Sequence, residues 1–325
     1  MSRLSDVLVR GVDQVFTAEF PALDAGGMAV VAKHAQRLRP WFTACNATDN
    51  PAAHAHASNV ATAIAMRQHG LEPIMQIVCR DKNRLAIQAD MVGAALHGVE
   101  NLCLLTGDDV TAGDEPEAKR VFDLDGPQAI AVADTLTRGT YLSGRALQPP
   151  PVLFPGAVEN PGAPPFDHRI ERVAKKAGAG ARFLQLQICF HPDRLAGFCR
   201  GVAAAALVGH APGTVSLLPT IVLVKGARAL RYMHEKVPGI DVPEDTMRRV
   251  SAAADQAEAA YQLTLELARE ALALPGVRGL HVTDFRHDDS VERLMRDLGR
   301  IPAAHPEESD AYRPAVGVQD RHDRP

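Results

Sequence analysis

The sequence predicts an α/β protein built as a single-domain (β/α)8 TIM barrel. Eight short β-like runs alternate with longer alanine-rich helical runs, and 325 residues is a normal length for one such barrel. This alternation requires parallel strands, because each crossover between parallel neighbours needs a helix. Polar residues also gather directly after the apolar runs, where barrel enzymes carry their chemistry. A doubly wound open sheet is the alternative fold.

Each expected strand is a short apolar run, and each expected helix is a longer alanine-rich run. The expected strands cover residues 14–20, 41–46, 73–79, 101–105, 152–158, 183–188, 214–221 and 279–283. The expected helices cover residues 27–38, 57–69, 83–97, 125–136, 167–177, 194–206 and a longer region, 227–274. On this interpretation residues 1–302 form one barrel domain, and residues 303–325 form a polar, proline-containing tail.

Composition excludes several classes of protein. Hydrophobic residues make up 46% of the chain and charged residues 23%, which is typical of a globular protein with a large core. The net charge of −4 does not indicate a nucleic-acid binder. No apolar run is long enough to span a bilayer, and the first residues lack a signal-peptide segment. Five cysteines without a CxxC pair predict reduced core thiols in a cytoplasmic protein.

Polar residues follow almost every expected strand at its C-terminal end, which is the functional face of a barrel. They include Glu19, Asn46, the pair Arg80-Asp81, the run Thr106-Gly107-Asp108-Asp109, Glu159-Asn160, Gln185 with Gln187, and Asp284. We expect Gly107 to let the chain turn away from its strand, leaving Asp108 over the barrel mouth. For any one of these carboxylates a solvated loop position is the alternative.

Several motifs, in order along the chain, resemble the methylenetetrahydrofolate reductase family. They are CRDKNRLAIQADMVGAALHGVENLCLLTGDD (79–109), FTAEFP (16–21), KKAGAGARFLQLQICF (175–190), VPGIDVP (237–243) and GVRGLHV (276–282). The resemblance covers residues 14–300 and is closest to the bacterial single-domain type. It implies a (β/α)8 barrel that uses FAD and NADH or NADPH to interconvert 5,10-methylenetetrahydrofolate and 5-methyltetrahydrofolate.

The resemblance implies that Glu19 is the general acid. The methylene carbon of the substrate lies in a five-membered ring between N5 and N10, and protonation of N10 opens that ring to an N5 iminium, which accepts the hydride. A carboxylic acid can do this if apolar surroundings raise its pKa, and we expect Phe16, Phe20 and Pro21 to supply them. A rim carboxylate that caps a helix is the alternative for Glu19.

Three further residues match substrate-binding positions of the family. Asp108 matches an aspartate between flavin and pterin, and its carboxylate suits the donors of the pterin ring. Gln187 matches a glutamine that contacts the pterin; a buried amide satisfied by backbone is its alternative. Met233, beside Tyr232, stands where the family has a stacking phenylalanine on the helix after the seventh strand.

The resemblance also implies a set of cofactor-binding residues. These are Asn46, Gln76, Thr106, Gly107, Asp108, Phe122, Asp123, Asp125, Val158, Asn160 and Lys176. The family lysine that corresponds to Lys176 meets the cofactor phosphate; an ordinary exposed helix lysine is the alternative. The preference between NADH and NADPH stays open.

The flavin side departs from the family pattern. Thr106 replaces an arginine of enterobacterial members, Gln76 a histidine, Asn46 a threonine and Val158 a tyrosine. A flavin-free reductase with direct hydride transfer from the nicotinamide is therefore an alternative. A folate-dependent methyl-transfer or demethylation barrel, or a non-catalytic binding barrel, are further alternatives.

Three other features allow structural predictions. His54 and His56 invite a metal site, but they lack a third ligand at useful spacing, so a substrate lid or a solvated loop is preferred. Arg80, Asp81 and Arg84 are expected to form a salt-bridge network at the corner after the third strand. The apolar face of residues 248–274 suits either the core or the interface of a homo-oligomer.

Overall fold

The computed structural model describes residues 1–11, 13–24 and 27–303, and within them eight parallel strands close into one barrel. The strands are β1 (Val15–Glu19), β2 (Ala44–Ala47), β3 (Pro73–Val78), β4 (Asn101–Leu105), β5 (Phe154–Glu159), β6 (Phe183–Leu186), β7 (Ser216–Leu223) and β8 (Gly279–Asp284). The predicted single-domain (β/α)8 barrel is confirmed. The open-sheet alternative is wrong, because β8 pairs with β1.

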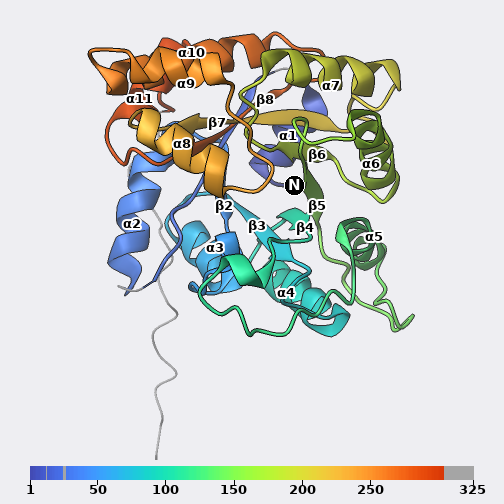
Figure 1. Cartoon of the computed structure of the whole chain (residues 1–325). Helices are drawn as coiled ribbons and strands as arrows, with labels where there is room; N and C mark the ends of the chain where they lie inside the picture. The colour runs from blue at the N-terminus through green and yellow to red at the C-terminus, as the bar shows by residue number, and fades with distance from the viewer. Residues whose placement is uncertain (12, 25–26, 304–325) are drawn as a thin grey trace, which may run out of the picture.

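Helices surround the strands on the outside of the barrel (Figure 1), and one helix, α1, lies at its N-terminal end. They are α1 (Arg3–Arg10), α2 (Gly27–Leu38), α3 (Asn59–Gln68), α4 (Arg84–Leu96), α5 (Gly126–Thr137), α6 (Phe166–Gly178), α7 (Pro192–Ala204), α8 (Ala227–Lys236), α9 (Glu244–Ser251), α10 (Gln256–Leu272) and α11 (Ser290–Asp297). None of these helices is both long and apolar enough to cross a membrane.

The structure corrects the predicted elements in three places. The region 227–274 is divided into α8, α9 and α10, which lie together on one side of the barrel (Figure 1). Two helices, α1 and α11, were not predicted. Except for Ala303, the predicted tail 303–325 lies outside the described residues.

Helix α1 closes the N-terminal end of the barrel. Its N-cap Ser2 accepts a hydrogen bond from the backbone N–H of Ser5, and Gly11 ends the helix with φ of +66°. Leu4 and Leu8 are buried among inward-facing apolar side chains of the strands, including Phe183. A short helix of this kind is stabilised mainly by the apolar face that it buries.

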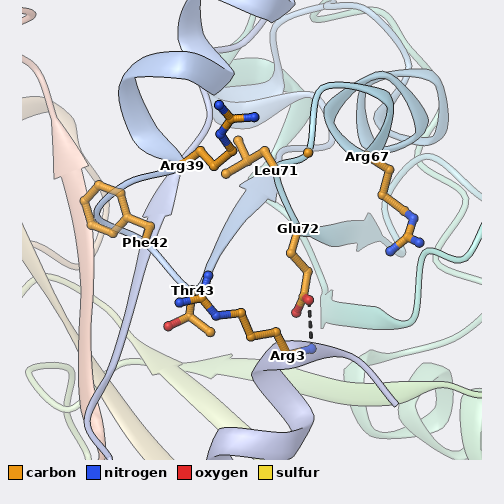
Figure 2. A pocket seen from close by; sticks show the side chains of 8 residues that line it. Arg3, Arg39, Phe42, Thr43, Arg67, Leu71 and Glu72 are labelled. Carbon is orange, nitrogen blue, oxygen red and sulfur yellow. Dashed lines mark hydrogen bonds between the residues drawn. The ribbon is translucent and has the colours of Figure 1, made fainter. Parts of the chain in front are cut away.

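Glu72, directly before β3, anchors this helix. Its two carboxylate oxygens accept hydrogen bonds from the backbone N–H groups of Arg3 and Leu4, each at 2.8 Å. A negative charge at a helix N-terminus is favourable because the first N–H groups have no partner within the helix. Glu72 also lines a cavity of about 250 Å³ between α1 and the loops before β2 and β3 (Figure 2). This cavity lies at the end of the barrel opposite to the mouth.

Truncating Leu8 tests whether α1 is part of the core. We expect Leu8→Ala to lower the free energy of unfolding by about 2–5 kcal/mol, because it leaves a cavity in the barrel floor. Val9→Ala is the matched control on the same helix, since Val9 is 40% exposed, and we expect a change within about 0.5 kcal/mol. Chemical denaturation measures both. Equal midpoints for the two variants would show that α1 does not close the barrel.

Candidate active site

Glu19 is the last residue of β1 and faces the inside of the barrel at its C-terminal mouth. It stands in register with Asn46 on β2, and the Asn46 side chain reaches across the interior to Gln185 on β6. Since neighbours in register point to the same side of a sheet, Glu19 points inwards as well. Phe16 and Phe20 belong to the core beneath the helices. The prediction that they surround the Glu19 carboxyl group is therefore wrong.

A layer of hydrogen-bonded polar side chains fills the barrel below Glu19. Asn46 and Gln185 form a reciprocal amide pair, with Nδ2 to Oε1 and Nε2 to Oδ1 both at 2.9 Å. Asn46 Nδ2 also lies 3.4 Å from His281 Nε2, and Thr17 Oγ1 lies 2.9 Å from His281 Nδ1. Cys103 Sγ approaches Gln185 Oε1 at 3.4 Å. All five residues are buried.

This layer is uncharged. Both ring nitrogens of His281 face an amide N–H: Nε2 faces that of Asn46 at 3.4 Å, and Nδ1 faces that of Gln185 at 3.3 Å. Two donors directed at the ring disfavour a doubly protonated, charged imidazole. Burial lowers the pKa of His281 to about 3, which agrees with a neutral ring. Sequence reasoning missed His281. Alternation along β8 could have indicated it, because His281 lies between two apolar residues that face the helices and therefore points into the barrel.

Glu19 has no side-chain hydrogen bond within the described part of the chain. The described residues around it offer neither a cation nor an N–H donor to the carboxylate, and burial raises its pKa to about 7. At neutral pH a large fraction of Glu19 is therefore protonated. A carboxylic acid with a pKa near the working pH is well suited to general acid catalysis.

The loop after β4 separates two neighbouring carboxylates. Gly107 has φ of +95°, and a Cβ atom there would lie 2.2 Å from Val78 Cγ1, so glycine is required at this turn. Asp108 then lies exposed, without a side-chain hydrogen bond among the described residues. Asp109 instead caps a short 3-10 helix, and its hydrogen bonds to Arg120 hold its pKa well below the usual range. One of the two carboxylates is thus structural and the other remains available.

The predicted salt-bridge network at the corner after β3 is correct only in part. Arg80 pairs with Asp81 through two hydrogen bonds of 2.6 Å. Arg84 does not join them. It forms a two-point pair with Asp123 from the loop after β4, with distances of 2.8 and 2.9 Å.

Lys176 forms a buried ion pair at the end of β5. Its Nζ lies 2.6 Å from Glu159 Oε2 and 2.5 Å from the Val158 carbonyl oxygen. Arg169 and Arg172 also contact the Glu159 carboxylate. Burial alone would raise the pKa of Glu159, but these cations outweigh it and hold the pKa below its usual range. Lys176 is therefore not the exposed helix lysine that was the alternative prediction.

A family model for methylenetetrahydrofolate reductase matches residues 7–299 of this chain. This chain belongs to that family. The match includes the whole barrel, from the last part of α1 to the end of α11.

Solved structures with the same fold are distant in sequence. A Clostridium thermocellum protein, described as uncharacterized and binding two copies of 5-methyl-5,6,7,8-tetrahydrofolic acid, is 12% identical with a TM-score of 0.62, and the match covers 91% of this chain and 97% of that one. The EDTA monooxygenase EmoA of Chelativorans sp. BNC1 is 9% identical, with a TM-score of 0.53 and coverage of 88% and 92%. DmoA of Hyphomicrobium sulfonivorans is 10% identical, with a TM-score of 0.51 and coverage of 93% and 90%. At these identities the likeness shows the barrel fold alone.

In this member of the reductase family, the residues predicted to hold FAD are largely engaged elsewhere. Lys176, the one cation among them, is neutralised by Glu159 and is buried. Asp123 holds Arg84, and Asp125 caps α5 through a capping box with Gln128. A diphosphate needs cations or free N–H donors. The predicted residues therefore do not fit the diphosphate of FAD in this conformation.

Other predicted cofactor residues differ in how far they remain available. Asn46 is held in the buried polar layer, and Asn160 donates from Nδ2 to the Gly239 carbonyl oxygen at 2.9 Å. Gln76 and Thr106 make no side-chain hydrogen bonds in the described part of the chain. Phe122 is exposed with φ of +41°, next to the mouth loops. The exposed ring of Phe122 is thus accessible, whereas the side chains of Asn46 and Asn160 are already hydrogen-bonded.

Met233 and Gln187 are positioned differently from each other. Met233 is 4% exposed and packs with Leu230 and other apolar residues of α8, α9 and α10. Positions 227, 230 and 233 form the buried face of α8, so Met233 lies in the core in this structure, and its predicted stacking role stays a prediction. Gln187 follows β6 directly, and its Oε1 accepts a hydrogen bond from the Ile188 N–H. Gln187 also lines a cavity of about 330 Å³ between α7 and α10.

The histidines of the loop after β2 have local partners. His56 Nδ1 lies 2.5 Å from Asp24 Oδ1, and His54 Nδ1 lies 3.0 Å from the Ala52 carbonyl oxygen. The described residues contain no group of three or more His, Cys, Asp or Glu side chains that could hold a metal ion. The loop rests on the loop after β4, where Asp114 accepts hydrogen bonds from the Ala55 N–H.

The raised pKa of Glu19 predicts a pH-dependent stability difference. The folded protein holds this proton up to a pKa of about 7, whereas an ordinary glutamate releases it near 4.5, so ionisation of Glu19 destabilises the fold as pH rises between those values. We expect Glu19→Gln to gain stability relative to the wild type from about pH 5 to about pH 8, by up to about 3 kcal/mol. Urea denaturation at both pH values measures it. A difference that does not change with pH would contradict the assignment.

Proposed function

We propose that this chain is a methylenetetrahydrofolate reductase, an oxidoreductase that interconverts 5,10-methylenetetrahydrofolate and 5-methyltetrahydrofolate with NADH or NADPH as the hydride source. The observation that carries the proposal is Glu19: a carboxyl group at the barrel mouth with no hydrogen-bond partner among the described residues and a pKa raised to about 7. The family match supports the same reaction class. The folate bound by the similar Clostridium thermocellum protein supports the choice of substrate.

The proposed role of Glu19 is to deliver one proton to N10 of the substrate. The bond between N10 and the methylene carbon then breaks, and its electron pair stays on N10. The N5 lone pair forms a double bond to the same carbon, and the resulting iminium accepts a hydride to become the methyl group. Glu19 leaves this step as a carboxylate and must regain a proton before the next turnover.

The proposed substrate contacts lie on neighbouring loops of the mouth. The exposed carboxylate of Asp108 can accept hydrogen bonds from the 2-amino and N3–H groups of the pterin. Gln187 has an amide that can donate to the ring while its Oε1 is held by the Ile188 N–H. Both residues lie at the C-terminal ends of their strands, on the same face of the barrel as Glu19.

Two hydride carriers are candidates. FAD is the carrier that the family resemblance implies, and the exposed ring of Phe122 remains available to it. The ion pair between Lys176 and Glu159 favours the second candidate, direct transfer from the nicotinamide to the substrate, because it removes the expected phosphate partner. On either candidate Glu19 and Asp108 keep the same proposed roles toward the folate.

An absorbance spectrum of the purified protein, followed by anaerobic addition of NADH and of 5-methyltetrahydrofolate, tests the proposal. Flavin bands that either compound bleaches would support the FAD-dependent reductase. Oxidation of NADH or NADPH that depends on methylenetetrahydrofolate, without flavin bands, would support direct transfer. Folate binding without oxidation of either nicotinamide would point to the methyl-transfer alternative and overturn the reductase proposal.

Replacing the acid separates chemistry from binding. We expect Glu19→Gln to lower the turnover number for methylenetetrahydrofolate by about 10²–10⁴-fold, because an amide cannot protonate N10. Affinity for 5-methyltetrahydrofolate should change far less. We also expect the wild-type rate to fall above about pH 7, as Glu19 ionises. Stopped-flow nicotinamide oxidation and calorimetric folate binding measure these effects.

Glu266→Gln is the control for that variant. It also turns a glutamate into an amide, but Glu266 pairs with Arg249 on the exposed surface of α9 and α10. We expect wild-type turnover and the wild-type pH profile. Wild-type turnover of Glu19→Gln itself would rule out Glu19 as the acid.

A further inference from the structure

We propose that Arg80 is a positioning residue that sets folate affinity by holding the backbone of Asp108, the proposed pterin-binding residue. The inference rests on the proposed function and deepens it, because it assigns a role to a residue that touches no reacting atom. It concerns the junction between the loops after β2, β3 and β4.

The guanidinium of Arg80 is buried at the point where these loops meet. Arg80 follows directly on β3, and its side chain is 2% exposed. Nε and Nη2 donate to Asp81, Nη1 donates to the carbonyl oxygen of Asp108 at 3.0 Å, and Nη2 also reaches the carbonyl oxygen of Asn50 at 3.3 Å. One side chain thus links three loops of the barrel mouth.

The backbone of Arg80 fastens the same loops. Its N–H donates to the Thr106 carbonyl oxygen at 3.0 Å, and its carbonyl oxygen accepts from the Val121 N–H at 2.8 Å. Both ends of the long loop between β4 and α5 are therefore attached to Arg80. The Asn50 side chain adds a hydrogen bond to Asp81 at 3.2 Å, which closes the network on the β2 side.

Asp108 depends on this attachment. Its own carboxylate has no hydrogen bond among the described residues and interacts with Arg80 only by Coulombic attraction, so the directional contact that holds the residue is made by its backbone carbonyl. Gly107 fixes the turn before it, against Val78 and Arg80 Cβ. The bond from Arg80 Nη1 to the Asp108 carbonyl then limits how far the exposed carboxylate can move. If the carboxylate is already held in its binding position, less conformational entropy is lost when the substrate binds, and the affinity is higher.

Arginine is required here for geometric reasons. Its planar fork can meet Asp81 at two points while the remaining N–H groups face two carbonyls in other directions. A lysine carries the same charge, but its single nitrogen cannot hold all three loops at once. The conservative variant Arg80→Lys therefore keeps the charge and loses the geometry.

Binding of 5-methyltetrahydrofolate to wild type and Arg80→Lys, by calorimetry, tests the proposal. We expect the dissociation constant and the KM for methylenetetrahydrofolate to rise by about tenfold or more, with the turnover number within about threefold of the wild type. The pH profile set by Glu19 should not move, because Arg80 does not contact Glu19. A loss confined to the turnover number would overturn the proposal.

Two further variants distinguish a specific loss of folate affinity from a general loss of stability. Arg80→Met combined with Asp81→Asn removes both charges, so no buried charge is left unpaired. Arg286→Met is the matched control, because Arg286 contacts Asp288 and the carbonyls of Val224 and Ala257, and its side chain is 12% exposed. We expect the control to lower stability without changing folate affinity. An equal loss of affinity in the control would overturn a specific role for Arg80.

Combining Arg80→Lys with Asp108→Asn shows whether Arg80 acts through Asp108. If it does, the second substitution adds little to the first, and the two effects are not additive. Fully additive effects would overturn the proposal. A wild type that neither binds nor reduces folate would overturn the proposed function and this role together. A wild type that does both, matched by Arg80→Lys, would overturn only the role of Arg80.

Discussion

The reciprocal hydrogen bonds between Asn46 and Gln185 determine the environment of Glu19. They span the barrel from β2 to β6. Together with the neutral ring of His281, the polar groups of the interior are hydrogen-bonded to one another. Within residues 1–11, 13–24 and 27–303, Glu19 therefore meets no cation and no N–H donor, and burial is left as the dominant influence on its pKa. An amide turned toward Glu19 instead would stabilise the carboxylate and lower that pKa. The acid on which the proposed chemistry depends is thus a consequence of a closed polar network beneath it.

The mouth above this layer is assembled by buried cations, each paired with a carboxylate. Arg80 joins three loops through Asp81 and two carbonyls, and Lys176 fixes the end of β5 through Glu159. Cations used in this way are not free to meet a phosphate. The pairing that joins the loops is therefore also the reason why Lys176 offers no free charge to a phosphate, while the carboxylate of Asp108 stays exposed.

The barrel could be predicted because the pattern that specifies it lies along the sequence. Apolar strand runs alternate with alanine-rich helices, and only parallel pairing accommodates that order. Helix α1 could not, because its short apolar face has meaning only against the open floor of the barrel. Gly107 was predicted correctly from its place after a strand. The burial of Met233 could not be predicted, since its position in the family pattern says nothing about which face of α8 the neighbouring helices cover.

The sequence by itself determined the fold class, the family, and the identity of Glu19 and Asp108 as the residues at the ends of their strands. Tertiary structure alone decided the protonation of Glu19, because that depends on which groups from β2, β6 and β8 lie below it. It also decided that Lys176 is paired and that Arg80 reaches Asp108. The physical reason is the same in each case: pKa values and ion pairs depend on distances between residues far apart in the chain, which no local pattern of residues contains.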